Sequence, residues 1–245
     1  MRADRPSAAV QDLLSGGPRE RLIVALDLPS LESAQALVDR LTPAVRWYKI
    51  GAELFTAAGP HAVELVLDRG GRIFLDLKFH DIPHTVAGAV RAALRLGVSM
   101  VTVHVAGGEA MMQAAASSRG PAPALVLGVT ALTSVDANVA HVVDLARAAR
   151  EAGLDGVVAA PREAAAVKAA LGRSCIVVTP AIRPSPAPTD DQRRTATPAE
   201  AAMSGSDFLV VGRPVTRAPD PLGAVEQILD EITRTYANRA RESER

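Results

Sequence analysis

The sequence of 245 residues has one cysteine, few aromatic residues and no excess of charge of either sign. A single cysteine excludes an internal disulfide and a cysteine-based zinc cluster, and we expect Cys175, within the apolar run CIVV, to be a buried, inert thiol. Aromatic residues make up only 3%, which argues against a stacking platform for single-stranded nucleic acid. With a formal net charge of zero, any anion has to be bound by a local site rather than by a global field.

Long hydrophobic runs are also missing. No apolar stretch approaches the roughly 20 residues of a membrane helix. Residues 1–20 are polar and lack the apolar core of a secretory signal. We therefore expect a cytoplasmic protein with no membrane or nucleic-acid partner. Residues 1–20 are expected to form a flexible arm, with room for a short helix, ahead of a single domain over 21–240.

Apolar residues are plentiful, at 48% against 22% charged, so a sizeable core is expected. Short β-branched runs recur along the chain, and each is followed by an Ala/Leu-rich segment with helical spacing. There are eight such runs: RLIVALD, VRWYKIG, RIFLDLK, MVTVHVA, ALVLGVT, DGVVAA, CIVVTP and FLVVGR. We expect the strands to end near Asp27, Lys49, Asp76, His104, Thr130, Val158, Thr179 and Val211.

Eight hydrophobic strands alternating with helices indicate an α/β fold with a parallel sheet, covered on its outer face. The regular repeat favours closure into a (β/α)8 TIM barrel. An open, doubly wound sheet is the alternative, but no Gly-x-Gly-x-x-Gly follows the first strand.

One connection is too long for an ordinary barrel loop. The segment AIRPSPAPTDDQRRTATP, residues 181–198, is rich in Pro, Asp and Arg and follows the seventh strand. Such segments are either functional lids or disordered. Because barrels often bind phosphate after this strand, we expect a lid.

The third strand, RIFLDLK, carries opposite charges two residues apart. Side chains alternate along a strand, so Phe74, Asp76 and Lys78 should share the face toward the barrel axis. They lie at the carboxyl end of the strand, where barrel enzymes place their active sites. Asp27, Lys49 and His104 end other strands at the same rim, where unpaired charges would be costly.

A second carboxylate, Asp81, follows Lys78 by three residues. Alone, it is equally well explained as the N-cap of the next helix, with Pro83 in the first turn. A functional role for Asp81 depends on its neighbours.

At this point the sequence resembles a known family. The stretch DLKFHDIPHTV resembles the Asp-x-Lys-x-x-Asp-Ile-Pro-x-Thr signature of the orotidine 5′-phosphate decarboxylases. The resemblance runs from about residue 21 to 235 and includes further ordered blocks: ALD, YKIGAELF, VHVAGG, GVTALTS, TPAIRP, the Gln192 region and LVVGRPVT. It implies decarboxylation of orotidine 5′-phosphate to uridine 5′-phosphate in a homodimer.

The resemblance also implies roles for individual residues. The active-site charges would be Lys49, Asp76, Lys78 and Asp81. Asp81 and Thr85 would enter the site of the neighbouring subunit. Asp27 would contact the ribose and Thr133 the base, while the phosphate would meet Gln192, Arg213 and the amide of Gly212, with Pro180 and Arg183 shaping that end.

These residue types suit a decarboxylation without a cofactor. Loss of CO2 leaves a carbanion at C6 that the pyrimidine ring does not delocalise, and other enzymes use an organic cofactor or a metal for such a task. We expect neither here. Lys78 would stabilise the developing charge and then protonate C6, with Asp76 beside the departing carboxylate. The Arg213 guanidinium matches the geometry of phosphate oxygens.

The sequence departs from the family pattern at Ala181, where TPGIRP is common. A positive φ there would cost alanine roughly 1–2 kcal/mol, and we expect instead a local backbone that accepts alanine.

Two alternatives remain. The Mg²⁺-dependent sugar-phosphate enzymes resembling 3-keto-L-gulonate 6-phosphate decarboxylase or hexulose-phosphate synthase share the Asp-x-Lys-x-x-Asp core. They typically carry Glu at the position of Lys49 and lack the Ile-Pro that follows Asp81 here. The second alternative is a non-catalytic sensor of nucleotide phosphates, although a sensor has no use for a buried proton donor.

Overall fold

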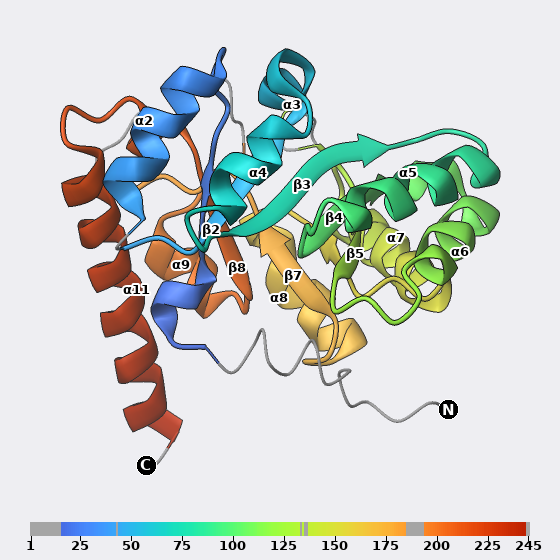
Figure 1. Cartoon of the computed structure of the whole chain (residues 1–245). Helices are drawn as coiled ribbons and strands as arrows, with labels where there is room; N and C mark the ends of the chain where they lie inside the picture. The colour runs from blue at the N-terminus through green and yellow to red at the C-terminus, as the bar shows by residue number, and fades with distance from the viewer. Residues whose placement is uncertain (1–15, 43, 133, 135–136, 185–193, 244–245) are drawn as a thin grey trace.

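Eight parallel strands close into a barrel in the computed structural model, which describes residues 16–42, 44–132, 134, 137–184 and 194–243, with side chains to residue 237 (Figure 1). Each strand pairs with the next along the chain, and the last pairs with the first. The expected (β/α)8 barrel is confirmed, and the open sheet is excluded. The strands are β1 Leu22–Ala25, β2 Trp47–Gly51, β3 Arg72–Phe79, β4 Met100–His104, β5 Leu125–Val129, β6 Gly156–Val158, β7 Ile176–Thr179 and β8 Phe208–Val211.

Helices surround the barrel, and the long terminal helix α11 packs along α2 and α9 (Figure 1). In the described part of the chain, no helix is both long and apolar enough to cross a bilayer. The helices are η1 Pro18–Arg21, α2 Leu31–Leu41, α3 Ala52–Ala58, α4 His61–Leu67, α5 Pro83–Arg95, η2 Val105–Gly107, α6 Glu109–Ser118, α7 Val139–Glu151, α8 Pro161–Leu171, α9 Pro198–Met203, α10 Arg213–Thr216 and α11 Pro221–Ser243.

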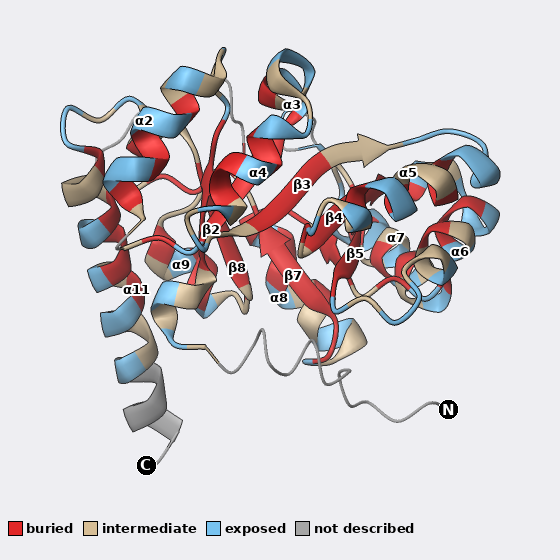
Figure 2. Ribbon diagram, in the orientation of Figure 1, coloured by how far each residue is buried: buried red, intermediate tan, exposed pale blue. Residues whose placement is uncertain are grey.

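The core has two layers, which follow from the alternation of side chains along each strand. Residues facing the axis form a compact inner cluster in which the rings of Trp47 and Phe208 meet edge to face, 5.4 Å between centroids. The other face of the sheet packs against the helices in a larger, mainly aliphatic cluster. In Figure 2, most of the strands are red, which marks their residues as buried. On β3, Phe74 belongs to the inner cluster and Ile73 and Leu75 to the outer one, as the alternation predicts.

Helix starts follow local chemistry. The Ser30 hydroxyl accepts a hydrogen bond from the amide of Ser33 and caps α2. Thr197 and Glu200 form a reciprocal capping box at the start of α9. Pro83 occupies the first turn of α5, as expected, but the N-cap of that helix is Ile82 rather than Asp81. The simple capping explanation for Asp81 is therefore wrong, since its carboxylate accepts only the adjacent amide of Ile82 among the described contacts.

The main departures from the expected strand ends lie at the rim that carries the charges. β1 ends at Ala25, before Asp27, whereas β3 continues to Phe79, beyond Asp76. β3 pairs with β4 in register up to Leu75 opposite Val101, and then resumes at Phe79 opposite Val103. Three residues of β3, Asp76, Leu77 and Lys78, therefore lie opposite the single residue Thr102 of β4. This interrupts the hydrogen-bonded ladder and forms an irregular bulge.

The remaining sequence expectations have mixed outcomes. Cys175 is buried, as expected. Ala181 has a φ of +64°, in the left-handed region where any Cβ atom is strained. The expectation of a local backbone that accepts alanine is therefore wrong. Of the proposed arm, the structure describes Gly16 onward, with η1 beginning at Pro18. Half of the proposed lid, residues 185–193, lies outside the described residues.

Candidate active site

Four charged side chains meet at the carboxyl end of the barrel and alternate in sign. The Lys49 Nζ lies 2.8 Å from Asp27 Oδ1 and 3.7 Å from Asp76 Oδ2. The Lys78 Nζ lies 2.8 Å from the same Asp76 oxygen. The order is therefore Asp27, Lys49, Asp76, Lys78, and the sequence prediction that the residues from β2 and β3 converge is correct.

Asp76 is the centre of this row and its side chain is only 11% exposed. Burial by itself raises the pKa of this carboxyl group, but the ammonium groups of Lys49 and Lys78 and the hydrogen bonds from Lys78 and Thr102 outweigh that effect, so its pKa is lowered. An ionised carboxylate buried between two cations produces a strong local electric field.

Lys78 occupies an unusual backbone position. Its φ of +51° lies in the left-handed region, which residues other than glycine seldom adopt. The residue sits inside the β3 bulge, and its amide donates to the Thr102 hydroxyl at 2.9 Å instead of to a strand carbonyl. Such strain costs about 1–3 kcal/mol and tends to gather at functional sites. The bulge directs the Lys78 ammonium group back onto Asp76.

Gly51 makes room for the outer pair. A Cβ atom at this position would lie 2.9 Å from both Asp27 Oδ1 and Lys49 Nζ. Any larger residue would therefore push the ion pair apart. Its place in the block YKIGAELF was visible in the sequence, but the reason for glycine requires the position of Asp27, which comes from another strand.

Two adjoining cavities open beside the charged row and share Asp27, Lys49, Pro180 and Val210. The inner cavity, of about 200 Å³, has Asp76 and Lys78 on one side and mainly apolar walls. The walls are Phe74, Val129, Ala131, Leu132, Val158 and Ala159. The outer cavity, of about 550 Å³, carries three arginines: Arg183, Arg213 and Arg217. A flat heterocycle suits the first cavity and an anion the second.

Most of the predicted site residues lie where they were expected. Pro180, Arg183, Gly212 and Arg213 all line the outer cavity. A Cβ at Gly212 would meet Ala25 and Asp27 no closer than 3.6 Å, so crowding within the protein does not require glycine there. Thr133 and Gln192 lie outside the described residues, so their predicted contacts remain predictions.

Asp81 and Thr85 do not reach this site within one chain. Both are exposed, and neither lines the two cavities. Figure 2 shows the chain changing from tan to pale blue as it leaves β3 and turns into α5. In the same segment the Ile82 side chain is 66% exposed. An exposed run with a large apolar residue and two predicted site residues is a candidate contact surface.

His104 ends β4 as expected, but it takes no direct part in the charged row. Its ring lies 5.5 Å from that of His80 and lines neither cavity. Burial, the neighbouring His80 and Lys78 lower the pKa of His104, and Asp76 opposes this. The neutral form is favoured, which agrees with a structural role.

Sequence patterns missed a buried ion pair behind the inner cavity. Arg194 donates to Glu163 of α8 at 2.7 Å, and both side chains are almost fully buried. A second nitrogen of Arg194 donates to the carbonyl oxygens of Ala131 and Leu132, at 3.2 and 2.7 Å. Because Ala131 and Leu132 line the inner cavity, this pair supports its wall. No local signal marks the pair, since its partners are far apart in the sequence.

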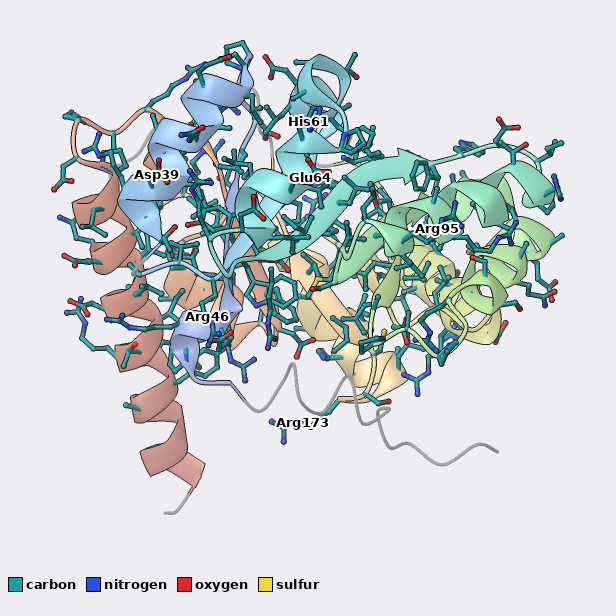
Figure 3. The ribbon with its side chains drawn as sticks, in the orientation of Figure 1. Asp39, Arg46, His61, Glu64, Arg95 and Arg173 are labelled. Atoms are coloured by element: carbon teal, nitrogen blue, oxygen red, sulfur yellow. The ribbon has the colours of Figure 1, made fainter. Side chains whose placement is uncertain are left out.

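The outer surface carries charged pairs of a different kind. His61 and Glu64 on α4 lie beside each other, with 2.9 Å between Nδ1 and Oε2, and both are largely exposed (Figure 3). Exposed pairs of this type contribute little to stability. The row at the barrel rim is distinguished by the burial of Lys49 and Asp76 and by the cavities beside it.

Comparisons with known proteins agree with this geometry. Residues 20–228 match the model of the Orotidine 5′-phosphate decarboxylase / HUMPS family. A curated orotidine 5′-phosphate decarboxylase from Moorella thermoacetica is 49% identical over 243 residues, covering 91% of this chain and 96% of the relative. A second, from Syntrophotalea carbinolica, is 49% identical over 232 residues, covering 87% and 95%.

Solved structures agree as well. The crystal structure of orotidine 5′-phosphate decarboxylase from Lactobacillus acidophilus superposes with a TM-score of 0.75 and 35% identity, covering 86% of this chain and 98% of that one. The match of the family model spans most of the barrel, from η1 into α11. This chain therefore belongs to the Orotidine 5′-phosphate decarboxylase / HUMPS family.

Proposed function

We propose a division of labour between the two cavities in the reaction that the family and the curated relatives assign to this chain. That reaction is the decarboxylation of orotidine 5′-phosphate to uridine 5′-phosphate and CO2, the last step of UMP biosynthesis. The inner cavity holds the pyrimidine ring against Lys78 and Asp76, and the outer cavity holds the phosphate. The observation that carries this proposal is the Asp27–Lys49–Asp76–Lys78 row, centred on the buried Asp76, with an arginine-rich cavity next to it.

Lys78 acts as the proton donor in this proposal. The bond between C6 and the carboxylate breaks, its electron pair stays on C6, and CO2 departs. The Lys78 ammonium group stabilises that pair and then transfers a proton to C6, after which solvent reprotonates the amine. Asp76, 2.8 Å from the Lys78 Nζ, holds the donor in place and lies beside the leaving carboxylate.

The outer cavity binds the phosphate dianion. Arg213 begins α10 directly after Gly212, so a guanidinium group and the Gly212 amide can face the same phosphate. Pro180 and Arg183 follow the end of β7, the strand next to β8, and line the same cavity. Asp27, shared by both cavities, is placed to contact the ribose between them. Binding energy from the remote phosphate then assists the chemical step.

Each site is completed by a second subunit in this proposal. Asp81 and Thr85 are exposed in the single chain, and Ile82 between them offers an apolar anchor for a partner. In a symmetric homodimer, each chain would extend this segment to the charged row of the other. Asp81 of the partner subunit would then lie on the far side of Lys78 from Asp76 and help to fix the ammonium group.

The same residues argue against the sugar-phosphate alternative within this family. Lys49 stands where the Mg²⁺-dependent enzymes carry glutamate, and its ammonium group lies 3.7 Å from Asp76 Oδ2. A cation at this position repels a divalent metal from the neighbouring carboxylate. We therefore propose that the reaction proceeds on the charges of the chain itself, without metal or organic cofactor.

We also propose a cytoplasmic location. The assignment of the chain to the last step of UMP biosynthesis supports it. Cell fractionation with an antibody against the chain tests this directly, and recovery in a secreted fraction would contradict it.

A metal-free assay tests the reaction and its independence of cofactors. Purified protein, treated with a chelator and dialysed, should consume orotidine 5′-phosphate at an unchanged rate, measured as loss of orotate absorbance. Release of uridine 5′-phosphate should match the loss. Tight nucleotide binding without turnover would favour a sensor, and activity that disappears with the chelator would favour the Mg²⁺-dependent chemistry.

A mixing experiment tests the shared site. Lys78→Ala and Asp81→Asn should each be nearly inactive alone. If Asp81 serves the partner, a mixed dimer has one doubly altered site and one intact site. Refolding the two variants together in equal amounts should therefore recover about a quarter of wild-type activity. If Asp81 serves its own chain, every mixed site keeps one defect and no activity returns.

A further inference from the structure

Thr102, in the middle of β4, lies directly beneath the catalytic charges. It is completely buried, and it faces the barrel axis because Val101 and Val103 on either side pack in the outer layer. Its hydroxyl accepts a hydrogen bond from the Lys78 amide at 2.9 Å and contacts Asp76 Oδ1 at 3.0 Å. One small side chain thus touches both the residue proposed to donate the proton and its counterion.

The direction of these two hydrogen bonds follows from their chemistry. A backbone N–H group can only donate, so the Thr102 oxygen must accept from Lys78. Its single proton is then available for Asp76 Oδ1, which accepts as an ionised carboxylate. This leaves Asp76 Oδ2 for the ammonium groups of Lys49 and Lys78, at 3.7 and 2.8 Å. The hydroxyl therefore fixes which carboxylate oxygen faces the lysines.

The position of Thr102 in the sheet explains why a side chain is needed there. It lies opposite the bulge, between the pairs Leu75–Val101 and Phe79–Val103. Within the bulge, the Lys78 amide has no strand carbonyl to bond, and a buried amide without a partner is costly. The Thr102 hydroxyl replaces that carbonyl and so holds the left-handed backbone of Lys78.

We propose that Thr102 is a positioning residue for decarboxylation, acting through Asp76 and Lys78. It keeps the Lys78 backbone in the strained conformation that returns its ammonium group to Asp76, and it orients the Asp76 carboxylate. This proposal rests on the proposed roles of Asp76 and Lys78. It adds that the third strand cannot present them correctly without a hydroxyl on the fourth.

Thr102→Val tests the proposal, because it removes the hydroxyl and keeps the shape of the side chain. We expect kcat to fall by about 10- to 100-fold, since small misplacements of reacting groups have effects of this size, while KM changes by less than about threefold. Thr102→Ser, which keeps the hydroxyl, should stay within about threefold of wild-type kcat. Rescue by serine separates the hydrogen bonds from the packing of the methyl group.

Thr179→Val is the matched control. Thr179 is an equally buried strand threonine whose hydroxyl lies 2.6 Å from that of Ser206, away from the charged row. It should lose stability to a similar extent as Thr102→Val and keep wild-type kcat when assayed well below its melting temperature. Equal kcat losses in the two variants would overturn the proposal, because any buried hydroxyl would then have the same effect.

A second measurement shows whether Thr102 acts through Asp76. In an Asp76→Asn background, the further change Thr102→Val should lower the residual kcat by less than about threefold. A full additional loss would contradict the proposed route. If Thr102→Val does not fold, Thr102→Ala replaces it in the same comparisons. Turnover of orotidine 5′-phosphate by the wild type, measured in parallel, tests the proposed function separately, because Thr102 is judged only by the ratio to that rate.

Discussion

The two ends of the barrel use buried charge in opposite ways. At the amino end, Asp207 precedes β8 and accepts from the Lys168 ammonium group at 2.6 Å and from the Val177 amide at 2.7 Å. Asp155 precedes β6 and is held in the same way by Arg119, at 2.5 Å, and by the amide of Val126. Each charge has an opposite partner and also binds backbone of a neighbouring strand.

At the carboxyl end, the charges satisfy one another only in part. Two lysines converge on one oxygen of Asp76, and the row opens onto the inner cavity. The amino-end pairs clamp adjacent strands together, whereas the carboxyl-end row presents charge to a ligand. In a barrel, this difference separates residues that maintain the fold from those that carry chemistry.

The largest expected effect breaks the carboxyl end. Lys78→Ala should lower kcat by about 10³-fold or more, because it removes both the cation and the proton donor, while some nucleotide affinity remains. Steady-state kinetics and nucleotide binding by calorimetry measure the two properties. The matched amino-end variant, Lys168→Ala, should retain kcat within about threefold at a temperature where it is folded. Near-normal turnover by Lys78→Ala would remove Lys78 from the role of proton donor.

The second prediction concerns stability: Lys168→Ala, which should have the smaller effect on kcat, should lose more stability than Lys78→Ala. Lys168→Ala leaves the buried Asp207 carboxylate without its cation, and should cost about 3 kcal/mol of unfolding free energy. Lys78→Ala should change stability by less than about 1 kcal/mol, because the Lys78 side chain is partly exposed and Asp76 keeps the Lys49 ammonium group 3.7 Å away. Urea unfolding followed by circular dichroism provides both values. A greater loss for Lys78→Ala would mean that the two ends do not differ as described.

The Arg194–Glu163 pair sharpens the comparison, because it lies near the carboxyl end but, like the clamps, joins a buried cation to a buried carboxylate. A double-mutant cycle with Arg194→Met and Glu163→Gln should give a coupling free energy of about 2 kcal/mol in stability. Since Arg194 also holds the carbonyl groups of Ala131 and Leu132, Arg194→Met should raise KM more than it lowers kcat. A kcat loss with unchanged KM would place this pair with the catalytic row instead.

A smaller effect is expected at Ala181. Its φ of +64° strains alanine, and Ala181→Gly should raise the unfolding free energy by up to about 1 kcal/mol once the greater freedom of glycine in the unfolded chain is included. Thermal and urea unfolding measure this. Gly172→Ala, at a φ of +78° in the C-cap of α8, is the reverse control and should destabilise. A destabilised Ala181→Gly would show that packing of the methyl group outweighs the strain.

The smallest effect is a difference in pH dependence. Burial raises the pKa of Asp207, although Lys168 and the Val177 amide oppose it, so the folded protein holds this proton more tightly than the unfolded chain. Stability from this group therefore decreases as pH rises from about 3.8 through the raised value. The lowered pKa of Asp76 acts in the opposite sense, and its contribution is lost as pH falls.

Melting temperatures measured from pH 3 to pH 6 should reveal the two signs. Relative to wild type, Asp207→Asn should remove a contribution to stability that decreases as pH rises. Asp76→Asn should remove a contribution to stability that increases as pH rises. The slopes matter, since the absolute melting temperatures also reflect lost hydrogen bonds. Slopes of the same sign for both variants would contradict the assigned pKa directions.

Local patterns in the sequence predicted the barrel and the inner face of β3. The alternation of Phe74 and Asp76 is enough to direct these two side chains to the axis without distant residues, whereas Lys78 reaches the same cavity through the bulge. The position of Asp27 next to Lys49 also follows, because neighbouring parallel strands end at the same rim. These predictions succeed because they need only the period of a strand and the order of the strands.

Features that depend on contacts between distant segments could not be predicted. The bulge in β3 arises from pairing with β4, so neither the left-handed Lys78 nor the role of Thr102 has a local signal. The Arg194–Glu163 pair joins segments 31 residues apart in sequence through an interaction that no periodic pattern records. Asp81 resembled a helix cap because the start of α5 at Pro83, which makes Ile82 the N-cap, could not be fixed to one residue from the sequence.

The bulge in β3 also affects how this barrel can change over evolutionary time. Two of its residues are surplus to the hydrogen-bonded ladder, since the strand advances four positions while β4 advances two. Shortening β3 by two residues would remove the extra residues from the ladder and move Lys78, the proposed proton donor, off the axis. In the proposed function, the chemistry therefore depends on two residues that the hydrogen-bonded ladder does not use.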